Sequence, residues 1–355
     1  MKKIICLIES LGSGGAERQL TGLATLLTNQ GHDVEVWYYA PNHFYCVELD
    51  KHGVKYRFIG EALNKFKRIG ILRKALLKAK PDTVISYLDA PCIIGCITKV
   101  TGGKFKLIVS ERNTTQHITL RDKVKFFLYR FADHVVPNSF SQAKFIEKNF
   151  PFLANKVTCI TNFVDTDRFQ PATQYSANTP TRVLTVARIM PQKNVVKYIE
   201  AIKEVVDRGY NIHIDWYGNS ASDGYYNTCM KSISEKGLCG VFNFHAATNN
   251  IIDEYHTSDI FCLPSIYEGF PNVVCEAMSC GLPILCSNVC DNPDIVTSEN
   301  GYLFTPTEVT DISAAIIRAI SMTREQREVM SKACRNRAIN LFSKEKFIDS
   351  YSKLL

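Results

Sequence analysis

The sequence predicts an α/β protein made of two doubly wound domains in series. Short apolar segments alternate with amphipathic stretches along the chain, which is typical of parallel sheets covered by helices on both faces. The alternation stops in a polar, proline-bearing segment at 170–181 and then restarts. With 355 residues, the chain is long enough for about two domains, each with its own core.

The first half of the chain begins with a strand, a glycine loop and a helix. We expect a strand at 3–9, a loop at 11–15 and a helix at 16–30, which ends at Gly31 because glycine readily terminates a helix. Further strands are predicted at 33–40, 83–88, 105–110, 134–138 and 157–161, with helices between them. These elements form a predicted first domain at 1–172.

The second half repeats this pattern after the linker. Strands are predicted at 183–187, 212–217, 241–244, 259–263, 284–286 and 302–304, followed by a long helical tail at 311–355. We expect a second domain at 181–343 and a last helix, about 344–355, that packs back on the first domain. Ligands of doubly wound sheets bind at the carboxyl ends of the strands, so two facing domains would form a cleft between their loops.

Composition excludes several classes of protein. Hydrophobic residues make up 46% and charged residues 22% of the chain, as in ordinary globular proteins, so extensive disorder is not expected. No apolar run approaches the roughly 18 residues of a membrane-spanning helix. Glu9 interrupts the apolar start of the chain, which we interpret as a strand and not as a signal peptide. The 13 cysteines form no C-x-x-C pair, which indicates reduced thiols in a cytoplasmic protein without structural zinc.

The first half of the chain is basic. Residues 1–175 carry 25 Lys and Arg against 15 Asp and Glu, a net charge of +10, whereas residues 176–355 carry 17 against 20, a net charge of −3. Such an excess favours an anionic partner, which could be nucleic acid, an anionic membrane or a phosphorylated substrate. Charge alone does not choose among the three.

A glycine-rich loop, Gly12-Ser13-Gly14-Gly15-Ala16-Glu17, joins the first predicted strand to the first helix. Gly14 and Gly15 would let the backbone approach a phosphate at the positive end of the helix. Glu17 stands where the third glycine of a dinucleotide-binding loop would be, which argues against a nicotinamide cofactor. A tight turn required only by the fold is the alternative.

Two cations follow the first strand of the second domain. Arg188 and Lys193 are five residues apart in a loop at the carboxyl end of that strand. A planar guanidinium and a compact ammonium in such a loop can clamp a diphosphate. Solvated surface charges are the alternative.

The most informative segment is 265–278, after the strand at 259–263. Glu268 lies in the predicted loop, Asn272 is the expected helix N-cap, and Glu276 follows eight residues after Glu268 in the first turns of the helix. This arrangement suits a nucleotide sugar, because backbone amides take phosphates while carboxylates accept ribose and sugar hydroxyls. The alternative is that Glu276 only favours the helix dipole and that Glu268 is solvated.

These motifs, in this order, resemble those of the retaining glycosyltransferases of family 4, which have the GT-B fold. The matching segments are Gly14-Gly15-Ala16-Glu17-Arg18, Asn162-Phe163-Val164-Asp165 with Phe169, Val186-Ala187-Arg188 with Lys193, Glu268-Gly269-Phe270-Pro271-Asn272 with Glu276, and Gly281-Leu282-Pro283. The resemblance implies donor binding in the second domain and acceptor binding mainly in the first.

The resemblance also implies roles for single residues. It places Arg188 and Lys193 on the diphosphate, Glu276 on the ribose and Glu268 near the donor sugar. The predicted donor-binding residues are Gly14, Gly15, Arg188, Lys193, Glu268, Phe270, Pro271, Asn272, Val273 and Glu276.

Two positions depart from the family pattern, and one catalytic position stays open. Ala187 and Asn194 stand where the family usually has glycine. Family members often place a histidine of the first domain near the donor sugar, and His117 is the best positional candidate, with His134 behind it. The predicted catalytic residues are therefore Glu268, Arg188, Lys193 and His117.

The sequence thus predicts a GT-B enzyme that moves a sugar from a nucleoside diphosphate sugar, with UDP the expected nucleotide, to an acceptor hydroxyl with retention. Polysaccharide or lipid-linked glycan assembly is the expected setting. A nucleotide-sugar epimerase of the same architecture and a non-catalytic carbohydrate- or partner-binding protein are the alternatives.

No cofactor and no metal are expected. The segment Asp165-Thr166-Asp167 matches the D-x-D pattern of metal-binding glycosyltransferases, but it precedes the linker, where we expect it to cap a turn. Arg188, Lys193 and the helix start would offset the charge of the leaving diphosphate without a metal.

Two basic stretches in the first domain predict where the enzyme works. Lysines and arginines alternate with apolar residues at 65–80 and again at 121–130, which gives a basic face beside an apolar face at helical spacing. Ordinary helices with solvated lysines are the alternative. We expect a cytoplasmic protein that docks on the anionic inner face of the membrane, takes a lipid-linked acceptor and binds no nucleic acid.

Overall fold

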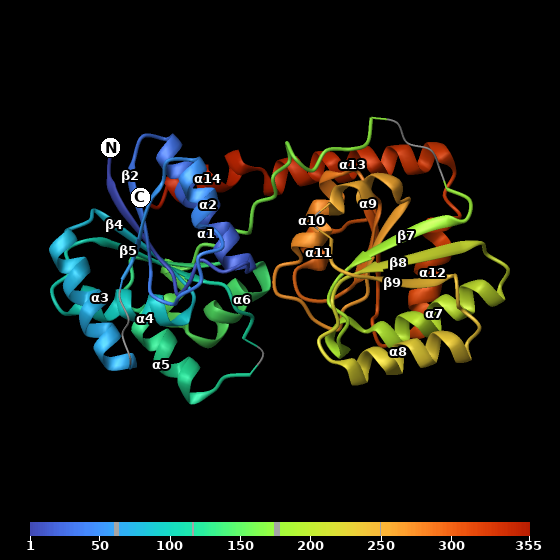
Figure 1. Ribbon diagram of the computed structural model, residues 1–355, viewed down its shortest axis with the longest axis horizontal. Helices are drawn as coiled ribbons and strands as arrows, with labels where there is room; N and C mark the ends of the chain where they lie inside the picture. Colours follow the sequence, from blue (N-terminus) through green and yellow to red (C-terminus); the bar gives the residue numbers. More distant parts are fainter. Residues whose placement is uncertain (60–63, 116, 174–177, 249) are drawn as a thin grey trace. The chain divides into compact units, whose positions relative to one another are not determined.

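The computed structural model of the chain describes residues 1–59, 64–115, 117–173, 178–248 and 250–355. It divides into two compact units (Figure 1): unit 1 contains Met1–Phe163 and Lys344–Leu355, and unit 2 contains Val164–Ser343. Each unit has a parallel sheet of six strands with helices packed against it. The predicted α/β class with two doubly wound domains is confirmed.

Unit 1 is built on a sheet with the strand order β3-β2-β1-β4-β5-β6. The strands are β1 (Lys3–Leu7), β2 (Asp33–Tyr38), β3 (Lys55–Phe58), β4 (Thr83–Tyr87), β5 (Lys106–Glu111) and β6 (His134–Pro137). The α-helices are α1 (Gly15–Asn29), α2 (Cys46–Lys51), α3 (Lys65–Ala79), α4 (Asp89–Val100), α5 (Leu120–Tyr129), α6 (Phe140–Asn149) and α14 (Lys344–Ser352). The strand order reverses between β1 and β4, which is where a ligand site is expected in such a sheet.

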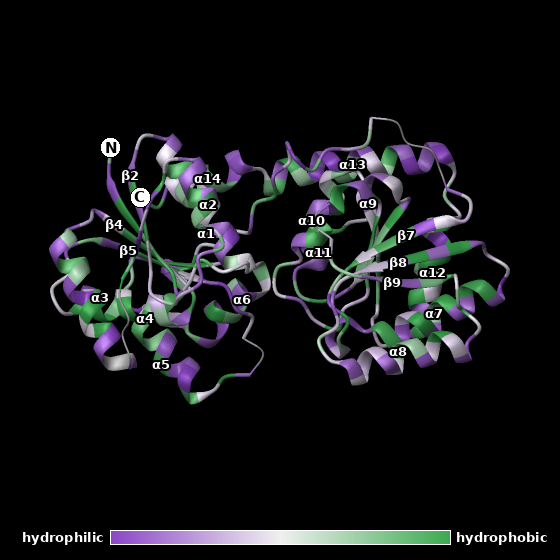
Figure 2. Ribbon diagram, in the orientation of Figure 1, coloured by the Kyte–Doolittle hydropathy of each residue, from purple (hydrophilic) through white to green (hydrophobic). Residues whose placement is uncertain are grey.

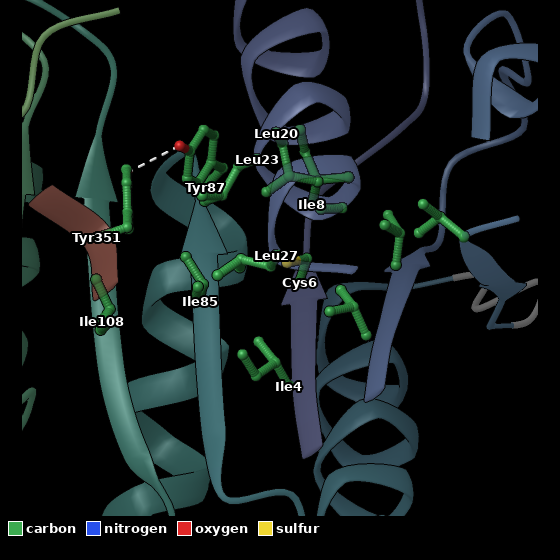
Figure 3. Close-up of a cluster of buried hydrophobic side chains, with 14 of the residues drawn as sticks. Ile4, Cys6, Ile8, Leu20, Leu23, Leu27, Ile85, Tyr87, Ile108 and Tyr351 are labelled. Atoms are coloured by element: carbon green, nitrogen blue, oxygen red, sulfur yellow. Dashed lines mark hydrogen bonds between the residues drawn. The ribbon is translucent and has the colours of Figure 1, made fainter. Parts of the chain in front are cut away.

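Alternate residues of β1 belong to two cores on opposite faces of the sheet. Ile4 and Cys6 pack against the leucines of α1 (Figure 3), whereas Ile5 and Leu7 pack with residues of α3, α4 and α5. The last helix, α14, completes the first of these cores, where the hydroxyl groups of Tyr351 and Tyr87 are hydrogen-bonded at 2.8 Å. In Figure 2, the helices carry both hydrophobic and hydrophilic stretches, as expected of helices that pack one face on a sheet.

Unit 2 has a sheet with the order β12-β11-β10-β7-β8-β9. The strands are β7 (Thr181–Val186), β8 (Ile212–Tyr217), β9 (Phe242–His245), β10 (Ile260–Leu263), β11 (Ile284–Ser287) and β12 (Gly301–Phe304). The α-helices are α7 (Val195–Asp207), α8 (Asp223–Glu235), α9 (Ile251–Thr257), α10 (Asn272–Ser279), α11 (Asn292–Ile295), α12 (Val309–Ile320) and α13 (Arg324–Phe342). One core surrounds Trp216 and the other surrounds Phe261. The order reverses between β7 and β10.

The predicted elements differ from the structure at 157–161, at β3 and in the helical tail. The strand expected at 157–161 is reduced to an isolated parallel bridge between Val157 and Val135 of β6. The N–H groups of Thr158 and Ile160 donate to the carbonyls of Val135 and Pro137, so the segment runs beside β6 without becoming a seventh strand of the sheet. The strand β3 was not predicted, because most of its residues are exposed at the edge of the sheet and no apolar run marks it. The helical tail expected at 311–355 consists of α12, α13 and α14. A capping box at Thr323 begins α13, and the last helix begins at Lys344.

The chain enters unit 2 before the predicted linker, at 163/164 instead of near 172. The backbone N–H of Val164 donates to the carbonyl of Phe342 at 2.8 Å, and Phe169 is buried in the core of unit 2. The guanidinium of Arg335 donates to the carbonyl oxygens of Thr166 and Phe169. The polar composition at 170–181 therefore marks a surface segment of unit 2, while packing decides the boundary.

Across the described parts of the chain, none of the helices is both long enough and apolar enough to cross a membrane.

Candidate functional site

The carboxyl ends of β7 and β10 bring two predicted loops together in unit 2. These strands are neighbours at the point where the strand order reverses, so their following loops meet at one edge of the sheet. The N–H of Ile266 donates to the carbonyl of Gln192 at 2.8 Å, and the side-chain amide of Gln192 donates to the carbonyl of Tyr267 at 2.9 Å. Residues that are about 75 positions apart in the sequence are thereby held side by side.

Lys193 and Glu268 form an ion pair in these loops. The Nζ atom of Lys193 lies 2.6 Å from Oε1 of Glu268, and the two side chains are only 15% and 9% exposed. The N–H of Glu268 also points to Sγ of Cys290, at 3.4 Å. The lysine and the carboxylate are therefore fixed relative to each other, which the sequence motifs did not predict.

Arg188 lies in the same loop as Lys193, and its side chain is exposed. The next residue, Ile189, is buried, and its N–H donates to the carbonyl of Asn219 at 3.0 Å. A firmly held backbone thus presents an exposed guanidinium in the loop that also carries Lys193. This arrangement can receive a diphosphate through a planar fork and a point charge.

The helix α10 carries the second predicted carboxylate. Glu276 is buried in α10, and its Oε2 accepts a hydrogen bond from the hydroxyl of Tyr255 at 3.3 Å. Phe270 and Pro271 are also buried, whereas Asn272 and Val273 are partly exposed. Asn272 is the first residue of the helix and Pro271 is the N-cap, so the predicted N-cap is wrong by one residue.

The two departures from the family pattern have structural explanations. Asn194 adopts the left-handed conformation, with φ of 59°, which asparagine tolerates better than most residues. Its side-chain amide donates to the carbonyl of Pro306 at 2.7 Å, an interaction that a glycine would lack. Ala187 meets Gly218, where an added Cβ would lie 2.0 Å from the Ala187 carbonyl oxygen. The backbones of Ala187 and Gly218 therefore come so close that residue 218 must lack a side chain, and in this chain it is glycine.

The predicted residues Gly14, Gly15 and His117 lie in unit 1 and not among the residues of unit 2 described above. Gly14 is the N-cap of α1, and an added Cβ would lie 2.2 Å from a carboxylate oxygen of Glu17. This carboxylate occupies space next to the glycine loop, which supports the interpretation of a tight turn over that of a phosphate loop.

His117 and His134 differ in their positions. His117 is exposed in the loop between β5 and α5. His134 is the first residue of β6 and so lies at the amino edge of the sheet, opposite to the edge where ligands bind. Burial, together with the charge of Lys106, lowers the pKa of His134. The position of His134 makes it unsuitable as the alternative to His117.

One basic residue of the stretch 121–130 is not on the surface. Lys125 is buried, and its Nζ lies 3.0 Å from Glu111 and 3.3 Å from Asp89. Burial would lower the pKa of Lys125, but the charges of Glu111 and Asp89 outweigh burial and raise it. The predicted basic face of this helix is wrong at Lys125. The position of Lys125 could have predicted its burial, because it precedes Phe126 and lies four residues before Tyr129, and both aromatic residues are buried.

The segment Asp165-Thr166-Asp167 forms a turn, as predicted. The side chain of Asp165 accepts a hydrogen bond from the N–H of Arg168 at 3.2 Å. In the part of the chain that the structure describes, no group of three or more His, Cys, Asp or Glu side chains is placed to hold a metal ion.

Comparison with known families divides the chain near the same boundary as the structure does. Residues 13–168 match the model of "Glycosyltransferase Family 4", and residues 167–337 match the model of "Glycosyl transferases group 1". The chain is 31% identical, over 319 residues, to the Escherichia coli UDP-Gal:alpha-D-GlcNAc-diphosphoundecaprenol alpha-1,3-galactosyltransferase, covering 82% of this chain and 79% of that protein. The chain belongs to the family 4 glycosyltransferases. It is therefore an enzyme that transfers a sugar, which disfavours the epimerase and the non-catalytic alternatives.

Another relative and two solved structures agree with this assignment. This glycosyltransferase is 29% identical to a Campylobacter jejuni N-acetyl-D-galactosaminyltransferase that acts on a GalNAc-containing diNAcBac-PP-undecaprenol, covering 78% of this chain and 77% of that protein. A glycosyltransferase from Rickettsia africae has a TM-score of 0.87 at 18% identity, covering 99% of this chain and 97% of that one. Anabaena HepE in complex with UDP has a TM-score of 0.85 at 19% identity, covering 99% and 98%. The fold of this glycosyltransferase is GT-B.

Proposed function

We propose that this glycosyltransferase moves a sugar from a UDP-sugar to a hydroxyl of a lipid-diphosphate-linked glycan, with retention of the anomeric configuration. The observation that carries the donor half is the buried Lys193–Glu268 pair beside the exposed Arg188, at the switch point of the sheet in unit 2. The acceptor half follows the names of the two relatives, which act on undecaprenol-linked diphosphate sugars. The UDP-bound structure of HepE supports the choice of nucleotide.

The donor residues act mainly by offsetting charge. Negative charge develops on the diphosphate as the glycosidic bond breaks, and cations that are already in place lower this barrier. Lys193 is held by Glu268, so it needs little reorganisation when the diphosphate arrives. Arg188 supplies the planar fork, Glu276 accepts the ribose hydroxyls, and Glu268 lies near the donor sugar. No metal or cofactor enters this mechanism.

Retention rests on the family resemblance. We propose no side chain near Lys193 and Glu268 as a covalent nucleophile. We propose that the acceptor hydroxyl attacks from the side on which UDP leaves and that the leaving phosphate takes its proton. We propose His117 of unit 1 as a further catalytic residue, as the family resemblance implies.

A ligand panel tests the donor. Melting temperatures would be measured with UDP-, GDP- and ADP-sugars, since a ligand at 100 times its Kd adds about 2.7 kcal/mol of stability. We expect a shift with UDP-sugars alone. A shift only with GDP- or ADP-sugars would contradict the proposed donor.

A transfer assay tests the acceptor and the metal. UDP-galactose, UDP-GlcNAc and UDP-GalNAc would be offered with lipid-diphosphate-linked GlcNAc, and product would be measured with excess chelator. We expect a product with an α-linkage and unchanged activity in chelator. No product with any of the three donors would overturn the proposed acceptor, and a loss of activity restored by magnesium would overturn metal independence.

We also propose an anionic membrane surface as a partner, reached through α5. The exposed apolar residues Leu120, Val124 and Phe127 recur at helical spacing on this helix, and the exposed Phe131 follows just after its end. The exposed cations Arg121, Lys123 and Arg130 lie among them. An apolar stripe with flanking cations fits the interface of an anionic bilayer. The enzyme would then work peripherally on the cytoplasmic face of the membrane.

Vesicle sedimentation tests this partner. We expect binding to phosphatidylglycerol vesicles that weakens with salt, and weaker binding to phosphatidylcholine vesicles. Phe127→Glu should reduce binding, while Phe152→Glu, an exposed aromatic elsewhere in unit 1, should not. Equal binding to both lipids, or no binding, would favour a soluble acceptor.

A further inference from the structure

The two sheets have the same strand order, which relates a carboxylate of unit 1 to Glu268. Read from one edge, the orders are β3-β2-β1-β4-β5-β6 and β9-β8-β7-β10-β11-β12. The strand β4 of unit 1 therefore takes the place of β10 in unit 2, on the far side of the switch point. In unit 2 the loop after β10 carries Glu268. In unit 1 the chain after β4 carries Asp89.

The backbone holds Asp89 at this edge of the sheet. Leu88 has φ of 73° and ψ of 162°, a conformation that residues other than glycine rarely adopt. This turn ends β4 abruptly and makes Asp89 the first residue of α4. A leucine at this position is costly, so the turn is maintained by the surrounding contacts.

The surrounding contacts converge on a buried lysine. Lys125 is 2% exposed, and its Nζ lies 3.0 Å from Glu111, 3.3 Å from Asp89 and 3.7 Å from Asp122. Glu111 is fully buried and also accepts a hydrogen bond from the hydroxyl of Tyr129 at 3.3 Å. Asp122 accepts hydrogen bonds from the backbone and side chain of Thr119 in the cap of α5. Two of the three carboxylates are therefore committed to internal partners.

Asp89 has one carboxylate oxygen available to a ligand. Its Oδ1 faces Lys125 at 3.3 Å, while in the part of the chain that the structure describes its Oδ2 contacts the guanidinium of Arg121 at 3.5 Å. The side chain of Arg121 is 76% exposed, so this contact is long, solvated and easily displaced. The side chain of Asp89 itself is 20% exposed.

The local charge decides which ligand fits. The carboxyl groups of Asp89, Glu111 and Asp122 surround Lys125, and Arg121 lies on the exposed side of Asp89. Burial raises the pKa of Glu111, so the charge that a ligand meets here is that of the partly exposed Asp89. An anionic group such as a phosphate would be repelled here, whereas a neutral hydroxyl donates readily to a carboxylate. This inference rests on the proposed function and on acceptor binding in unit 1, which the family resemblance implies.

We propose that Asp89 accepts a hydrogen bond from a hydroxyl of the acceptor sugar and that Lys125 is a positioning residue that holds its carboxylate. Asp89 and Glu268 then each bind one of the two substrates. They follow equivalent strands of the two sheets, and each is paired with a lysine. The interaction is a hydrogen bond and involves no covalent step.

Steady-state kinetics of Asp89→Asn and Asp89→Ala test the proposal, with UDP-galactose, UDP-GlcNAc and UDP-GalNAc as donors and lipid-diphosphate-linked GlcNAc as acceptor. Asp89→Ala should lower kcat/KM for the acceptor by roughly 10- to 100-fold, mainly through KM, because one charge-assisted hydrogen bond is lost. The Kd for UDP, measured by calorimetry, should not change. Asp33→Asn is the matched control, because Asp33 pairs with Lys55 at 2.8 Å but lies at the amino end of β2.

Lys125→Met tests the positioning role. This variant should raise the acceptor KM while the affinity for UDP and the acceptor-independent hydrolysis of the donor stay unchanged, which a general loss of packing would not produce. If Lys125→Met does not fold, Asp89→Asn decides the question, since it keeps the shape of the side chain. If the wild type transfers the sugar and both Asp89 variants keep its acceptor KM, the proposed role of Asp89 is overturned while the proposed function stands. No transfer by the wild type would overturn the proposed function, and this inference with it.

Discussion

Unit 1 and unit 2 share a strand order but use their lysines differently. In unit 2, Lys193 reaches the carboxyl edge of the sheet and pairs with Glu268, next to the exposed Arg188. In unit 1, Lys125 is buried among carboxylates, while the exposed cations of α5 lie beside an apolar stripe. The comparison shows that equivalent edges of the two sheets carry different charged groups, because the loops that follow the strands differ.

The largest expected effect comes from removing the cations of unit 2. Arg188→Ala and Lys193→Ala should each lower turnover by about one to two decades, because each removes a charge-assisted contact worth roughly 1.5 to 3 kcal/mol in the transition state. Steady-state kinetics at saturating donor would measure this. Arg208→Ala, at the exposed end of α7, is the control and should stay within about twofold. Normal turnover in a folded Arg188→Ala/Lys193→Ala double variant would contradict the proposed role of these cations at the carboxyl edge of the sheet in unit 2.

The two glutamates of unit 2 sharpen the comparison within one site. Glu276→Gln should weaken UDP binding by roughly tenfold through the lost ribose contact, whereas Glu268→Gln should lower turnover more than it lowers UDP affinity. Calorimetry with UDP and kinetics on the same preparations separate the two effects. Equal losses of UDP affinity in both variants would refute this division of roles.

A left-handed residue in each unit gives a smaller test of stability. Asn194→Ala should destabilise unit 2 by about 2 kcal/mol, because alanine fits the left-handed conformation poorly and the bond to Pro306 is lost. Asn194→Gly should cost less. Lys80 has φ of 48° in unit 1 but is exposed, so Lys80→Gly should change stability by less than about 1 kcal/mol. Melting curves would measure all three, and equal losses for Asn194→Ala and Lys80→Gly would contradict the prediction.

The smallest expected effect is acid stability in unit 2. Burial would raise the pKa of Asp215, but hydrogen bonds from Arg182 and His245 outweigh burial and lower it. A carboxyl whose pKa is lower in the folded state stabilises the protein above its unfolded pKa of about 3.9, and this contribution is lost as the pH falls below that value. Asp215→Asn should therefore lower the melting temperature at pH 6 and reduce its further fall between pH 4 and pH 3. An unchanged slope would refute the assignment.

The periodic parts of the fold could be predicted from the sequence because they depend on local patterns. The buried strands of both sheets read as apolar runs, and the restart of the pattern after 170–181 indicated a second domain. The edge strand β3 lacked this signal, since its side chains are mostly exposed. The segment at 157–161 had the signal and hydrogen-bonds to β6 at Thr158 and Ile160, but only Val157 forms a bridge with that strand. Pairing is a property of two segments, and one segment does not specify it.

The sequence by itself determined which residue types were available for chemistry. The spacing of Arg188, Lys193, Glu268 and Glu276 after predicted strands pointed to the loops that we propose bind the donor, because short-range order fixes where a strand ends. It did not reveal the contact between Lys193 and Glu268, which join loops 75 residues apart. Nor did it distinguish the buried Lys125 from its exposed neighbours.

Only the tertiary structure decided these points. Burial of a lysine depends on the carboxylates that other elements place around it, and here Glu111 comes from β5 and Asp89 from α4. The same holds for α14, the last helix in the sequence, which contributes Tyr351 to the core of unit 1. Local sequence determines helices, strands and their ends, while charge pairing and core membership arise from groups that become neighbours only when the chain folds.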